Sequence, residues 1–193
     1  MEINSEKKKI ILESTLELVR EFGFHGFPIS EVANRGGVAV GTIYYYFEGK
    51  DQLIQELYLY VVDLIFQEAL KKDDASMSFK ERYFIFWNNL VDLYHSKPAI
   101  LSFFELYNNS SYYSDEAFVR EGKFYKWLFM FFEEGLKSGE LKPIDKEVLA
   151  VLVLGNMHTT AKVKMNRSLR SGNKPIDLDK ISKIIWEGIS NKT

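Results

Sequence analysis

The chain has 193 residues, of which 46% are hydrophobic and 27% are charged, so it can form the core of a globular protein. It contains no cysteine, which excludes disulfides, catalysis by a thiol and zinc sites with cysteine ligands. The formal net charge is -2, so the overall charge gives no sign of a nucleic-acid partner.

Apolar residues recur at helical spacing along the chain, and no alternating runs of β-branched residues indicate strands. We therefore expect an all-α protein. The first helix is predicted at about residues 5–22, with Phe22 facing inward, and Gly23 ends it. The N-terminal segment lacks the apolar core of a signal peptide, and the longest apolar run, residues 148–154, is shorter than the ~20 residues that span a membrane. We expect a cytoplasmic protein with no membrane partner.

Residues 28–50, PISEVANRGGVAVGTIYYYFEGK, are the most informative segment of the chain. They predict two short helices, near residues 29–35 and 40–47, joined by a turn at the glycine pair 36–37. A third helix is predicted to begin at Lys50. This order is typical of a helix-turn-helix, whose second helix enters the major groove of DNA.

The second of these short helices has one predicted apolar face. Ile43 and Phe47 are four residues apart and therefore lie on the same side of the helix. The side chains left to project outward carry hydroxyls and aromatic rings, and they are Thr42, Tyr44, Tyr45 and Tyr46.

This segment resembles the TetR family of transcriptional repressors. In that family a turn of the type Ala-Gly-Val-Ser precedes Gly-Thr-Leu-Tyr-x-His/Tyr-Phe, two further residues and Lys. The matching residues here are 36–39, 41–47 and Lys50. Two residues depart from the pattern: Pro28 stands where Ser or Thr is usual, and Ala39 replaces the usual Ser. Each departure removes a helix cap worth roughly 1 kcal/mol.

The resemblance implies that the chain binds double-stranded DNA at a pseudo-palindromic operator. Lys50 is expected to contact a phosphate from the start of its helix, although an isolated lysine is more often simply solvated. Lysines 7–9 are expected at a helix start as well. Tyr45 and Val40 are candidates for contacts with bases, whereas Tyr44 could instead pack between helices. The predicted DNA-binding residues are Ser30, Val40, Gly41, Thr42, Tyr44, Tyr45, Tyr46 and Lys50.

The rest of the chain predicts a helical second domain. Helices are expected at about residues 50–72, 76–95, 98–107, 114–137, 145–167 and 177–190. We expect a DNA-binding domain at residues 1–49 and a ligand-binding and dimerisation domain at residues 50–193. The seam is expected within the helix at 50–72, which the two domains share as a rigid rod.

Aromatic residues are concentrated in this second domain. Rings at helical spacing are usually plain core, but polar residues are interleaved here, and the TetR resemblance implies a site for a small inducer. We expect a lipophilic or aromatic ligand. The predicted ligand-binding residues are Trp87, Asn88, Phe103, Tyr107, Phe124, Trp127, Phe131, Met157 and His158.

The last two helices are apolar over a wide face, which suits either a central position in the fold or a shared interface. The resemblance favours the second alternative, a homodimer formed through these two helices. Gly155 and Ala161 would allow their close approach.

We find no catalytic residues. The three histidines lack metal-ligand spacing, and the P-loop-like stretch at residues 36–42 has Thr42 in place of the phosphate-binding lysine. We expect no enzyme activity, metal or cofactor. The predicted function is a DNA-binding regulator, a repressor released by a lipophilic ligand. The alternative is a helical carrier of lipids or small molecules, or an enzyme, without DNA binding; neither needs the cluster at residues 42–50.

Overall fold

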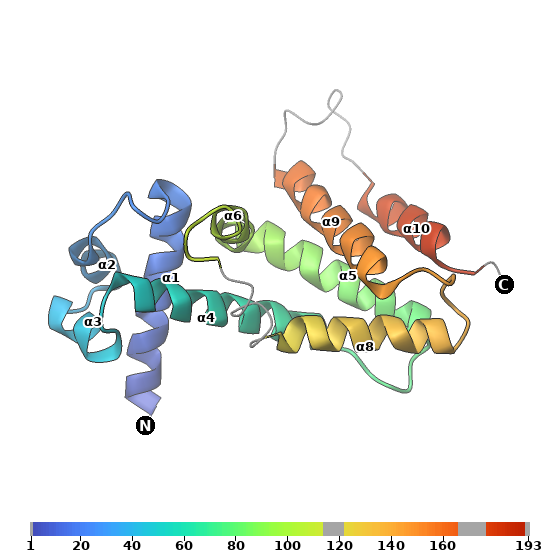
Figure 1. The fold of residues 1–193 in the computed structure, drawn as a ribbon, viewed down its shortest axis with the longest axis horizontal. Helices are drawn as coiled ribbons and strands as arrows, with labels where there is room; N and C mark the ends of the chain where they lie inside the picture. The colour runs from blue at the N-terminus through green and yellow to red at the C-terminus, as the bar shows by residue number, and fades with distance from the viewer. Residues whose placement is uncertain (1, 114–121, 166–176, 192–193) are drawn as a thin grey trace. The chain divides into compact units, whose positions relative to one another are not determined.

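The computed structural model describes residues 2–113, 122–165 and 177–191 (Figure 1). In these residues the regular structure is helical, apart from an isolated β-bridge between Leu141 and Ser190, and the expected all-α fold is confirmed. None of the helices in the described ranges is long and apolar enough to cross a membrane.

The observed helices follow the predicted order closely. The expected helix at residues 114–137 is seen from Lys123 onward, and its part at 114–121 lies outside the described residues, as do residues 166 and 167 of the next predicted helix. The helices are α1 (Glu2–Phe22), α2 (Ile29–Gly36), α3 (Val40–Tyr46), α4 (Lys50–Leu70), α5 (Phe79–Ser96), α6 (Pro98–Tyr107), α8 (Lys123–Lys137), α9 (Lys146–Met165) and α10 (Leu178–Ile189).

The chain divides into two compact units. The first comprises Met1–Asp63 with Pro98–Glu121, and the second comprises Leu64–Lys97 with Gly122–Thr193. α4 therefore contributes residues to both units, and α6 belongs with α1, α2 and α3. The domain boundary after residue 49 stays a prediction.

The core of the first unit is built where α1 packs against α2, α3 and α6. The predicted inward position of Phe22 is wrong, because its side chain is 54% exposed. Gly23 adopts a left-handed conformation with φ 68°, which turns the chain after α1 and brings Phe24 inward instead. The Phe24 ring packs edge-on against Phe103 of α6, with the ring centroids 5.8 Å apart.

The core of the second unit is built where α9 packs against α5, α8 and α10. α5 begins at a capping box, in which the Ser78 and Glu81 side chains each accept a hydrogen bond from the other's backbone N–H. One turn further on, the largely buried Arg82 guanidinium donates to Asp73 at 2.7 Å and to Glu134 of α8 at 2.6 Å. This ion-pair cluster joins the segment before α5 to α8.

Candidate nucleic-acid interface

The turn between α2 and α3 has the geometry that its glycines predict. Gly37 follows α2 with φ 62°, a left-handed conformation that costs glycine little and other residues much more. The N–H groups of Gly37 and Val38 donate to the carbonyls of Asn34 and Ala33, at 3.3 and 3.0 Å. These bonds satisfy the last carbonyls of α2 and fix the direction in which α3 starts.

Neither helix of the motif has a side-chain cap. Pro28 and Ala39 are the N-cap residues of α2 and α3, and neither side chain accepts a hydrogen bond from its helix start. α3 has only seven residues, too few to be stable alone. Its position depends on packing, since Ile43 and Phe47 are each only 1% exposed.

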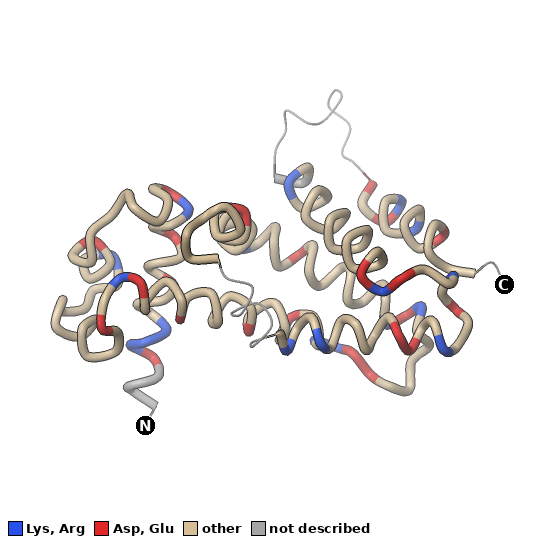
Figure 2. The backbone as a smooth tube through the Cα atoms, in the orientation of Figure 1, with Lys and Arg blue, Asp and Glu red and all other residues tan. Residues whose placement is uncertain are grey.

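The opposite side of α3 faces solvent. Val40, Tyr44 and Tyr45 are 41%, 56% and 71% exposed. No residue of α3 is charged, and its tube is tan throughout in Figure 2. Thr42 and Tyr46 are half-buried, while Gly41 and, on α2, Ser30 are exposed. The helix thus presents aromatic rings with hydroxyl tips rather than charges.

Lys50 is the first residue of α4, which follows α3 in the chain, and it is half-buried. Its ammonium donates a hydrogen bond to the carbonyl of Phe27 and lies 4.0 Å from the centre of the Phe27 ring. Burial lowers the pKa of Lys50 below its ordinary value of 10.5. An ammonium has three donors, so this contact leaves others for a phosphate. The sequence offered no signal for the role of Phe27, and the phosphate contact stays a prediction.

The lysines at residues 7–9 are not at a helix start, because α1 begins earlier, at Glu2. The free backbone N–H groups that attract a phosphate are those of the first turn, and these lysines lie beyond it. Lys8 is also paired with Glu56 of α4, with 3.0 Å between the charged atoms.

An ion pair that the sequence analysis missed connects α1 to α2. Arg35 donates two hydrogen bonds to the Glu21 carboxylate, at 2.6 and 2.8 Å. The hydrogen bond from Arg35 lowers the pKa of Glu21 below its ordinary 4.5. These residues are fourteen positions apart, so helical spacing gives no indication that they meet.

The predicted ligand-binding residues fall in both units. Phe103 and Tyr107 of α6 are buried in the first unit, where both rings lie near Phe24. The others belong to the second unit and are Trp87 and Asn88 on α5, Phe124, Trp127 and Phe131 on α8, and Met157 and His158 on α9.

Within the second unit, part of this set is in contact. Trp127 and Phe131 stack with ring centroids 5.3 Å apart, and Phe124 stacks on Trp127 at 6.1 Å. His158 Nε2 and the buried Tyr94 hydroxyl are 3.2 Å apart, whereas Asn88 is exposed.

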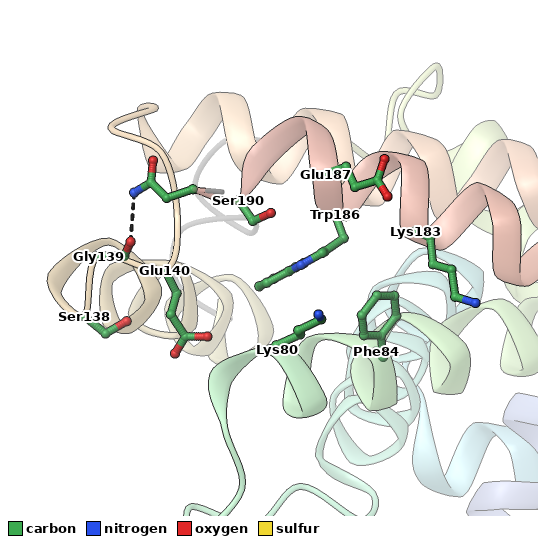
Figure 3. A pocket seen from close by; sticks show the side chains of 10 residues that line it. Lys80, Phe84, Ser138, Gly139, Glu140, Lys183, Trp186, Glu187 and Ser190 are labelled. Atoms are coloured by element: carbon green, nitrogen blue, oxygen red, sulfur yellow. Dashed lines mark hydrogen bonds between the residues drawn. The ribbon is translucent and has the colours of Figure 1, made fainter. Parts of the chain in front are cut away.

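Hollows in the described part of the second unit are lined by few of these residues. One, of about 660 Å³, is lined by Trp127 and Phe131 together with Met130 and Arg82. Another, of about 610 Å³, lies where α5, α10 and the α8–α9 turn meet. Figure 3 shows Phe84 and Lys80 of α5 extending toward Trp186 of α10 in this hollow. None of the residues that line this hollow was among the predicted ligand-binding residues.

Comparisons with known proteins match both parts of the chain. A family model described as bacterial regulatory proteins of the tetR family matches residues 11–57. A second, described as the tetracyclin repressor-like C-terminal domain, matches residues 78–190.

Relatives match over most of their length. An uncharacterised helix-turn-helix transcriptional regulator from Haemophilus influenzae is 29% identical over 170 residues, which cover 88% of this chain and 84% of the relative. The structure of a TetR-family regulator from Vibrio parahaemolyticus is 27% identical with a TM-score of 0.79, covering 96% of this chain and 100% of that one. A TetR-family regulator structure from Haemophilus influenzae is 23% identical with a TM-score of 0.85, covering 99% and 100%.

The second family model alone matches more than half of the 193 residues. The helix-turn-helix lies within residues 11–57, which the first model matches. The matched proteins are transcriptional regulators and not enzymes. The chain therefore belongs to the TetR family and is a transcriptional regulator with an N-terminal DNA-binding helix-turn-helix.

Proposed function

We propose that the protein is a repressor that binds a pseudo-palindromic operator as a homodimer and leaves it when a small lipophilic ligand binds. The observation that carries the DNA-binding part is the two-sided character of α3. Ile43 and Phe47 anchor one side in the core, while Tyr44 and Tyr45 are more than half exposed on the other. A short helix held in this way suits insertion into a major groove.

The contacts expected from α3 are mostly with the DNA backbone. Residues 36–47 contain no Arg, Asn or Gln, the side chains that make strong bidentate contacts with bases. The hydroxyls of Thr42, Tyr44 and Tyr46 and the ammonium of Lys50 suit phosphates, and Tyr45 and Val40 suit base edges and thymine methyls. Operator choice then depends largely on DNA shape.

A second copy of the chain is the proposed partner of α9 and α10. These helices pack together through one side, yet they expose aliphatic side chains on others. Val151 is 74% exposed and Ile184 is 56% exposed. Around Gly155 an added Cβ would meet nothing within 4 Å, so another backbone can approach there. Two helices from each subunit would bury these aliphatic groups in a four-helix bundle.

The proposed ligand site is in the second unit. Trp127 and Phe131 combine stacked rings with a hollow of about 660 Å³, a size that suits a small molecule. Its lining combines the rings of Trp127 and Phe131 and the Met130 side chain with the charged residues Arg82, Glu133, Glu134 and Lys137, which suits a ligand with a lipophilic body and a polar group. The structure of AibR, 18% identical with a TM-score of 0.70, was determined with isovaleryl coenzyme A and operator DNA. That likeness concerns the fold alone.

Release follows from linkage. A ligand that binds more tightly to the DNA-free form weakens operator binding by the same factor by which DNA weakens ligand binding. α4 has residues in both units, so it is one of the covalent connections through which such a change would pass.

An electrophoretic mobility shift assay with the DNA upstream of the protein's own gene tests the proposal. The proposal is supported if an excess of random DNA does not abolish the shift, and if mutation of either of two symmetric half-sites weakens it. If no shift occurs at low salt with micromolar protein, the proposed function is wrong. Repression itself is tested with a reporter gene behind the same operator, since an activator would raise the signal.

A further inference from the structure

Tyr112, in the segment after α6, contacts the start of α4. Its hydroxyl donates a hydrogen bond to Asp51 Oδ1 at 3.0 Å. The centroid of its ring lies 5.3 Å from that of the Phe24 ring, and it stacks on the His25 ring with the centroids 6.2 Å apart. Phe24 and His25 are in the connection between α1 and α2, so Tyr112 touches two parts of the DNA-binding unit at once.

The backbone that carries Tyr112 is itself held in place. The Tyr112 N–H donates to Ser110 Oγ at 3.2 Å, and Ser110 in turn donates its N–H and hydroxyl to the carbonyl of Tyr107. The Tyr107 ring stacks on Tyr58 of α4, with centroids 4.5 Å apart and planes 14° apart. The segment is thus fixed to α4 at Tyr58 and again at Asp51.

Asp51 directly follows Lys50, the residue proposed to hold a phosphate. Lys50 is attached on its other side to the carbonyl of Phe27 in the α1–α2 connection. The first two residues of α4 are therefore each held by a side-chain contact, Lys50 to Phe27 and Asp51 to Tyr112. Burial and the nearby Asp51 carboxylate raise the pKa of Tyr112, as expected for a phenol that donates to this acid.

We infer that Tyr112 is a positioning residue for operator binding, which holds the first turn of α4 so that the Lys50 ammonium faces a DNA phosphate. Tyr112 does not itself contact DNA. This inference rests on the proposed function, and it adds to the DNA-binding machinery a residue more than fifty positions beyond the helix-turn-helix. It assigns a role to the segment after α6 that neither the motif nor its spacing indicates.

The test is a double-mutant cycle between Tyr112→Phe and Lys50→Ala, read as operator affinity. Tyr112→Phe keeps the ring contacts and removes only the hydroxyl. We expect it to weaken operator binding by about three- to tenfold, the range for a lost hydrogen bond to a carboxylate near the surface. In the Lys50→Ala background the same change should have almost no further effect, because the group that Tyr112 positions is absent.

Tyr113→Phe is the matched control, since it removes a hydroxyl from the adjacent residue and should leave operator affinity unchanged. The melting temperatures of all variants show that each is folded. Equal affinity of Tyr112→Phe and the wild type overturns the inference, and so does an equal loss in both backgrounds, which would indicate general loosening. A wild-type protein that binds no DNA overturns the inference and the proposed function together, whereas the two former outcomes leave the proposed function intact.

Discussion

Two exposed apolar surfaces of this protein have opposite chemistry. The α3 surface, defined by Val40, Tyr44 and Tyr45, ends in phenol hydroxyls. The α9–α10 surface is defined by four exposed aliphatic side chains, those of Val148, Val151, Leu152 and Ile184. Tyrosine has an apolar body and a polar tip, so the first surface suits a partner that stays hydrated, as a DNA groove does. The second gains free energy only where water is excluded, as in a protein–protein interface.

The two surfaces also differ in how their helices are held. α3 has seven residues, no side-chain cap and two buried anchors. α10 has twelve residues, and its N-cap Asp177 accepts a hydrogen bond from the N–H of Lys180. A recognition helix without its own cap takes its orientation from its neighbours, so changes elsewhere in the unit can reorient it. A capped helix gains stability at its own end that does not depend on a partner.

The largest effect is expected from a charge on the α9–α10 surface. Leu152→Asp would bury a carboxylate in the proposed interface, and we expect the dimer to weaken by more than about a hundredfold. Sedimentation velocity at micromolar concentration measures the change, and operator binding should fall with it.

Met130→Asp is the matched control, because Met130 is 61% exposed on α8 and lies outside the proposed interface. It should leave the sedimentation coefficient unchanged. A wild-type chain that sediments as a monomer, or a Leu152→Asp variant that remains a dimer, would show that this surface has another purpose.

A smaller effect is expected from removing a ring from the α3 surface. Tyr45→Ala should weaken operator binding by roughly tenfold through lost contacts at the base edges. Because no charge changes, the slope of log affinity against log salt should stay the same. Fluorescence anisotropy at several salt concentrations separates these two quantities, and an unchanged affinity would exclude Tyr45 from the interface.

Lys50→Ala is expected to cost about fivefold in affinity and to flatten the salt slope by about one phosphate contact. All DNA sequences should be affected alike. Lys80→Ala in the second unit is the control for net charge and should leave the slope as in the wild type. Because Lys50 also bonds to Phe27, the melting temperature must be measured alongside. A fall in stability with an unchanged slope would assign Lys50 to structure alone.

The smallest effect concerns the pair that attaches α2 to α1. Since the folded-state pKa of Glu21 is lowered, its contribution to stability is present above about pH 4.5 and is lost as the pH falls through the lowered value. Glu21→Gln should therefore reduce stability near neutral pH and lessen the loss on acidification, which thermal melts measure. In an Arg35→Gln background the same substitution should have a much smaller effect, because only the weaker attraction of Arg20 remains; an effect as large as in the wild type would show that Arg35 is not the main partner of Glu21.

The sequence predicted the features that depend on local chemistry. The turn at the glycine pair 36–37 and the shared apolar side of Ile43 and Phe47 follow from residue type and spacing, and the structure confirms them, with the left-handed conformation at Gly37. The inward position of Phe22 was wrong because the turn after α1 changes which residue meets α6. The apolar spacing of a helix does not show which residue at its end still faces the core.

Long-range contacts were beyond such reasoning. The contact of Lys50 with Phe27 joins residues 23 positions apart, and the bond from Tyr112 to Asp51 joins residues 61 positions apart. Aromatic residues of α6 and α8 look alike in sequence, yet α6 lies in the first unit and α8 in the second. Composition identifies the rings, but only the chain's path decides which ones share a core.

The hydrogen bonds at the end of α10 have a practical consequence for engineering this protein. Asn191 donates its N–H to the Glu140 carbonyl at 2.9 Å, and its amide side chain donates to the carbonyls of Gly139 and Leu141 at 2.8 and 2.9 Å. A truncation that ends at Ser190 would delete all of these bonds and expose the end of α10 to proteases. Shortened forms made for crystallisation should therefore keep Asn191, and affinity tags fused to the C-terminus need a spacer after it.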